Sequence, residues 1–153
     1  MKYYTQVLKK YAVFDGRAGR KEFWMFALIN LIFLVIANIL DGSIFRTPLY
    51  TSPGGTVYGL IDSLYLLGVF IPTLSVAVRR LHDTNHSGWW MLSFLLPILL
   101  LMLMMIPMSH TFLEILGIVD AGVFFVIFYI YLRTLVKDST PGGNKYGPNP
   151  KEA

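Results

Sequence analysis

The most constraining feature of this sequence is a long apolar run, residues 89–135, that few charged side chains interrupt. As one straight helix it would be about 70 Å long, because an α-helix rises 1.5 Å per residue. The hydrocarbon core of a bilayer is only about 30 Å thick, so the run must fold back once if it lies in a membrane. The polar segment between Pro107 and Thr111 is the natural turn, which predicts spans at about 89–106 and 112–135.

Two further apolar runs precede this one and predict spans at about 23–40 and 60–78, the second kinked at Pro72. The loop between them is rich in glycine and proline. We therefore expect an all-α membrane protein, a four-transmembrane-helix bundle that forms a single domain over residues 1–153, with a polar tail at 136–153.

The composition supports a membrane protein and excludes several classes of site. Hydrophobic residues make up 55% of the chain and charged residues 14%, with no cysteine. A soluble domain carries about a quarter charged residues. The missing cysteine excludes disulfides, thiolate metal sites and cysteine nucleophiles.

The first 22 residues predict a short amphipathic helix at the membrane interface. Four apolar residues recur at helical spacing, with lysines on or near the opposite face: Tyr4, Val7, Leu8 and Tyr11 against Lys2, Lys9 and Lys10. Such a helix lies in the headgroup region with its apolar side toward the membrane.

The distribution of lysine and arginine predicts the topology. If four spans alternate, twelve of the thirteen basic residues fall on one side and only Arg46 falls on the other. Cytoplasmic loops carry the excess of basic residues, so we expect both termini and the loop after residue 78 to be cytoplasmic. The same rule explains the net charge of +4 without a nucleic-acid partner.

Three polar segments carry a family resemblance: residues 14–24 (FDGRAGRKEFW), 78–90 (VRRLHDTNHSGWW) and 142–150 (GGNKYGPNP). Together they resemble the bacterial inner-membrane family known only as domain of unknown function 805. The resemblance covers nearly the whole chain and implies an inner-membrane location. It implies no activity and no catalytic residues.

All three segments fall on the predicted cytoplasmic face, where they could meet in one assembly that binds lipid headgroups or a partner protein. The candidate residues are polar, basic or aromatic: Arg17, Arg20, Arg79, Arg80, His82, Asp83, His86, Trp89, Trp90, Asn144 and Tyr146. Arginine suits phosphate and carboxylate groups because its donors form a planar fork. The simpler interpretation makes the arginines topology signals and the tryptophans interfacial anchors.

The central segment also holds a weak metal-site pattern. His82 and His86 are four residues apart, and on a helix they would share a face beside Asp83. A metal site needs more ligands than these three, so we favour an Asp83 ion pair with Arg79 or Arg80 and predict neither metal nor cofactor.

Acidic residues within the predicted spans suggest an alternative function. Asp62, Glu114 and Asp120 lie in the outer halves of the spans, and Asp120 could bond to Asn38 across helices. Intramembrane acids often mark ion or proton paths. They would serve a small oligomeric transporter or channel.

We therefore expect a non-enzymatic membrane protein with a cytoplasmic Arg/His/Asp/Trp face. Its expected partners are membrane lipids, with a protein partner or a second copy of the chain left open. No nucleophile motif or phosphate-cradling loop suggests an enzyme.

Overall fold

The computed structural model describes residues 2–45, 50–51 and 57–152. Its elements follow in chain order: α1 (Lys2–Lys9), α2 (Arg20–Leu40), the π-helical turn η1 (Asp41–Phe45), β1 (Tyr50–Thr51), β2 (Val57–Tyr58), α3 (Leu60–Asp83), the 3-10 helix η2 (Gly88–Phe94), α4 (Leu95–Leu103) and α5 (His110–Val136). The two strands form a two-residue antiparallel hairpin, so the described fold is helical apart from this tip.

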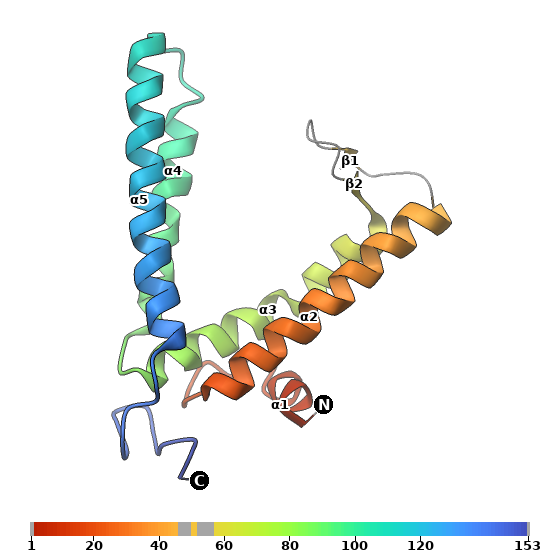
Figure 1. Ribbon diagram of the computed structural model, residues 1–153, viewed down its shortest axis with the longest axis vertical. Helices are drawn as coiled ribbons and strands as arrows, with labels where there is room; N and C mark the ends of the chain where they lie inside the picture. Colours follow the sequence, from red (N-terminus) through yellow and green to blue (C-terminus); the bar gives the residue numbers. More distant parts are fainter. Residues whose placement is uncertain (1, 46–49, 52–56, 153) are drawn as a thin grey trace.

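The helices form two antiparallel arms, α2 with α3 and α4 with α5, which diverge from a shared end (Figure 1). The arms meet where α3 ends, η2 begins and α5 ends, and both termini lie near this end (Figure 1). The structure therefore differs from the predicted four-helix bundle. The sequence shows which helices are apolar, but it does not show how the two hairpins pack on each other.

Three of the described helices are long and apolar enough to cross a membrane: α2 extended to Ser43, α3 and α5. The predicted third span is instead a shorter apolar segment, Gly88–Leu103, that starts as a 3-10 helix. The predicted turn between the last two spans is present, because α5 begins at His110.

α1 packs across the basic end of the α2–α3 arm (Figure 1). Val7 is fully buried in a small core with Ala18, Phe26 and Val76, and Tyr4 stacks on Phe26 with ring centroids 5.2 Å apart. The apolar side of α1 was predicted to face the membrane. Part of it faces protein instead, because aromatic residues of α2 bury it.

Polar side chains tie α1 and the turn after it to the long helices. Pro72 has no N–H, so the carbonyl of Gly68, four residues earlier, loses its helical partner. The Tyr11 hydroxyl donates to that carbonyl at 2.6 Å. The Tyr65 hydroxyl donates to Asn30 Oδ1 at 2.5 Å within the arm.

Asp41 connects the outer ends of α2 and α3. Its carboxylate accepts hydrogen bonds from the backbone N–H groups of Ile61 at 3.0 Å and Asp62 at 2.9 Å. These N–H groups have no partner inside α3, so the carboxylate caps the helix. Gly59 lies directly against it, and a Cβ there would be 2.0 Å from Asp41 Cγ.

Candidate functional site

The structure brings the three polar segments of the sequence together at the shared end. The Ala18 N–H donates to the Arg79 carbonyl at 3.0 Å, which joins the first segment to the second. The Thr140 N–H donates to the Asp83 carbonyl at 3.1 Å, and Asn144 Nδ2 donates to the His82 carbonyl at 2.9 Å. The tail is therefore folded onto the end of α3.

Asp83 is the centre of this assembly. Its fully buried carboxylate accepts from Arg17 Nε at 2.9 Å through Oδ1, and from Arg80 and the Ser139 hydroxyl through Oδ2. A buried charge is costly unless it is paired and hydrogen-bonded. Here one carboxylate serves two arginines, which leaves the cluster with one excess positive charge.

Arg17 links the first segment to the tail. Besides Asp83, it donates to the carbonyls of Gly142 and Thr140, each at 2.8 Å. The side chain is almost completely buried. Its guanidinium donors are thus occupied by groups of the protein.

Arg80 closes the end of α5. Its Nε and Nη2 donate to the carbonyl of Leu135 at 3.1 and 3.0 Å, and Nη2 also donates to the carbonyl of Lys137. The last carbonyls of a helix have no partner within it, and cationic side chains commonly satisfy them. Arg80 is therefore an internal structural residue, not a residue exposed to lipid.

Arg79 differs from both of these arginines. Its Nη1 donates to Glu22 Oε1 at 2.8 Å, but its Nε and Nη2 have no hydrogen-bond partner within the described part of the chain. The side chain is fully buried.

The two histidines have separate environments. His82 stacks on Tyr146 with ring centroids 3.7 Å apart, and its Nδ1 lies 3.2 Å from the Gly16 carbonyl oxygen. α3 ends at Asp83, so His86 does not share a helical face with His82, contrary to the metal hypothesis. His86 contacts Thr84 and lies edge-on to Trp90. No group of three potential ligand side chains that could hold a metal occurs in residues 2–45, 50–51 and 57–152.

Trp89 and Trp90 remain exposed at the start of η2. Arg20 lies at the edge of the assembly, where Nη2 is 3.1 Å from Asp138 Oδ2. Lys151 contacts the same carboxylate. Hydrogen bonds from Lys151 and from the Ser139 N–H hold the pKa of Asp138 below its usual value.

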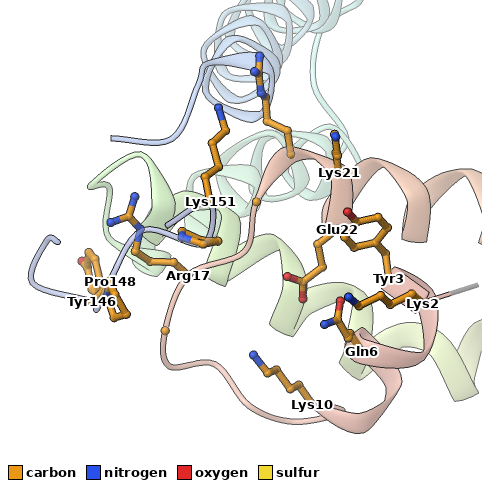
Figure 2. Close-up of a pocket in the computed structure, with 14 residues that line it drawn as sticks. Lys2, Tyr3, Gln6, Lys10, Arg17, Lys21, Glu22, Tyr146, Pro148 and Lys151 are labelled. Carbon is orange, nitrogen blue, oxygen red and sulfur yellow. The ribbon is translucent and has the colours of Figure 1, made fainter. Parts of the chain in front are cut away.

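A basic cavity of about 890 Å³ opens beside the assembly, and sequence reasoning missed it (Figure 2). It lies between α1, the start of α2 and the tail. Six of its lining residues are basic and one is acidic: Lys2, Lys10, Arg17, Arg20, Lys21 and Lys151 against Glu22. The available sequence signal was that Lys2, Gln6 and Lys10 recur every four residues, which puts them on one helical face.

The acids of the predicted spans are divided between the two arms. Asp62 and Asn38 line a small cavity of about 290 Å³ on the α2–α3 arm. Glu114 and Asp120 lie on α5, where Glu114 is exposed and Asp120 is buried with Oδ1 unpaired within the described residues. Arg46, the one basic residue predicted on the opposite side of the membrane from the others, lies outside the described residues.

Comparison with known proteins gives one consistent result. The family model for proteins of unknown function, DUF805, matches residues 11–148. The chain is 35% identical over 151 residues to the inner membrane protein YhaH of Escherichia coli K12, covering 99% of this chain and 98% of YhaH. It is also 35% identical over 151 residues to the inner membrane protein YhaI of the same strain, covering 99% and 97%. No solved structure matches the chain.

Proposed function

This chain belongs to the DUF805 family of proteins of unknown function, and from that premise we propose that it is an inner-membrane protein whose cytoplasmic end binds anionic lipid headgroups. The proposed binding site is the basic cavity between α1, α2 and the tail. The proposal includes no catalysed reaction.

We propose four membrane crossings with both termini in the cytoplasm. The η2–α4 segment has a length that supports the fourth crossing. A 3-10 helix rises about 2.0 Å per residue and an α-helix 1.5 Å, so Gly88–Leu103 reaches roughly 27 Å. That length is close to the hydrocarbon thickness of a bilayer. The excess of basic residues at the shared end supports its cytoplasmic orientation.

The charge of the cavity is the observation that carries the headgroup proposal. Lys2, Lys10 and Lys21 make no ion pair with any described residue, although all three line one cavity. The cytoplasmic leaflet is negatively charged, and each basic residue near it contributes about 1 kcal/mol of attraction. A cavity with several uncompensated cations at this surface is suited to a phosphate-bearing headgroup.

The buried assembly supports a structural role for most of the predicted binding residues. Arg17 and Arg80 each bond to Asp83, and they also donate to backbone carbonyls of the tail and of the end of α5, so few of their groups are available to a ligand. His82 and His86 are engaged with Tyr146 and Thr84. These contacts favour a rigid platform beside a binding cavity over an acid–base catalytic site.

The test measures how much lipid the purified protein retains when one basic residue in the lining of the cavity is replaced. Lys10→Gln removes one cation from the lining, and Lys9→Gln removes the same charge from an exposed neighbour that does not line it. We expect Lys10→Gln to reduce phosphatidylglycerol retained by the purified protein several-fold, measured by native mass spectrometry, because a charge-assisted contact is lost.

Lys9→Gln should leave this retention near the wild-type value. If both variants lose the same amount of lipid, the effect comes from the overall charge of the protein and not from the cavity. If retention is unchanged in both variants, the cavity is not a headgroup site.

A further inference from the structure

The cations of the basic cavity come from two different parts of its lining. Lys2 and Lys10 belong to the α1 side, whereas Lys21 belongs to the start of α2 and Lys151 to the tail (Figure 2). Arg20, at the start of α2, also lines the cavity. The two parts come from different segments of the chain. A ligand that forms ion pairs with the cations of both segments must therefore carry negative charge at two separate points.

The charge balance of the cavity exceeds what one phosphate can neutralise. Lys2, Lys10 and Lys21 have no ion-pair partner among the described residues. Arg20 and Lys151 share one carboxylate, that of Asp138, which leaves a further positive charge in this part of the lining. A phosphodiester carries one negative charge, so a single one would leave most of these cations uncompensated.

The start of α2 adds donors to one part of the lining. Gly19 precedes the helix, and no side chain among the described residues caps its first N–H groups. Free N–H groups and the helix dipole together favour an anion at such a position. Gly19, Arg20 and Lys21 all line the cavity, so this helix start faces the same space as the lysine side chains.

The segment that supplies one side of the cavity, α1 with the turn after it, is amphipathic and favours a lipid over a soluble ligand. Tyr3 lines the cavity and is exposed, and Leu8, Tyr11 and Phe14 present exposed apolar surface on α1 and the turn after it. Amphipathic segments of this kind lie at the headgroup level of a membrane. A lipid could place its headgroup in the cavity and its acyl chains beside this surface.

We propose that the basic cavity is a site for a lipid headgroup that carries two phosphates, as in cardiolipin. One phosphate binds at the start of α2 near Lys21, and the other binds between Lys2 and Lys10 on α1. This proposal rests on the proposed headgroup-binding function and specifies the class of lipid. The volume of about 890 Å³ is within the range of about 300–1,000 Å³ for small-molecule sites.

The experiment compares two lipids at equal phosphate. The purified, detergent-solubilised protein is titrated with cardiolipin, and separately with twice the molar amount of phosphatidylglycerol, with phosphatidylcholine as the neutral reference. We expect cardiolipin to bind roughly tenfold more tightly than phosphatidylglycerol per phosphate, the equivalent of one additional charge-assisted hydrogen bond. Lys2→Gln combined with Lys10→Gln should weaken cardiolipin binding more than phosphatidylglycerol binding, and so remove the preference, because cardiolipin loses the contacts of its second phosphate. Lys9→Gln should preserve the preference.

Each contrary outcome identifies what fails. Equal affinity for the two anionic lipids at matched phosphate would overturn the two-phosphate proposal and leave headgroup binding in place. No preference for either lipid over phosphatidylcholine would overturn both. Inorganic pyrophosphate is the soluble arm of the test, and its binding as tightly as cardiolipin would overturn the assignment to a lipid.

Discussion

Asp83 has the greatest structural consequence of any single residue at the shared end. Its carboxylate contacts Arg17, which lies 66 positions earlier in the sequence, and Arg80, which lies three positions earlier. It also accepts a hydrogen bond from Ser139 in the tail. A buried ion pair stabilises little by itself, but removal of one partner leaves an uncompensated buried charge. Here that removal would leave both Arg17 and Arg80 unpaired.

We therefore predict that Asp83→Asn lowers the free energy of unfolding by roughly 3–5 kcal/mol, the usual cost of breaking a buried pair. The measurement is thermal unfolding of the purified protein in detergent. Asp138→Asn is the matched control because Asp138 also contacts two cations but is more than half exposed. It should unfold close to the wild type, since exposed pairs contribute little. Similar unfolding for both variants would argue against a buried network.

For single residues, the sequence predicted which side chains belong to the polar assembly better than it predicted what each one contacts. The three motifs gave the family, and the comparisons confirm it. The charge pattern predicted one membrane face for Arg17, Arg80 and Asp83, and in the structure both arginines form ion pairs with Asp83. Whether a buried arginine faces a ligand or a carbonyl depends on contacts such as Arg80 with Leu135, which no local pattern specifies.

At the scale of helices, the apolar runs predicted α2, α3 and α5 well, because length and hydropathy depend only on local sequence. The connections were less predictable. The Asp41 cap on α3 and the Tyr11 bond to the Gly68 carbonyl both join residues distant in sequence. The 3-10 start of the third apolar segment also gave no clear signal.

The Asp41 cap leads to a prediction for Gly59. A methyl group at this position would lie 2.0 Å from Asp41 Cγ, so the cap must shift to admit it. We expect Gly59→Ala to destabilise the protein by about 1–3 kcal/mol, as overpacking commonly does, and to lower the thermal midpoint. Gly68→Ala is the control on the same helix, because a Cβ there meets nothing within 4 Å. An unchanged midpoint for Gly59→Ala would contradict the described cap.

At the scale of the whole molecule, two helical arms diverge from an end that three distant segments build (Figure 1). The fold class was predicted in part: the chain is helical and its long helices can span a membrane. Their packing was not predictable, since apolar surfaces in lipid carry little information about which helices touch. The basic cavity exists only because the N-terminal segment and the tail meet at this end.

The N-terminal segment, the end of α3 and the tail form one assembly at the shared end. The most direct test uses cysteine crosslinks, which this cysteine-free chain allows without background. Cysteine pairs are introduced at Gly16 with His82 and at His82 with Tyr146, where the structure gives direct contacts. The control pair is Ser43, in η1 after α2, with Ser139, in the tail after α5, because the outer end of α2 and the start of the tail lie at opposite ends of the α2–α3 arm (Figure 1).

A short bismaleimide is added to protein in native membranes, and intramolecular crosslinks are identified by mass spectrometry. We expect efficient crosslinking of both contact pairs and none of the control pair. Crosslinking of neither contact pair, in variants that still insert into the membrane, would contradict the shared end and with it the basic cavity.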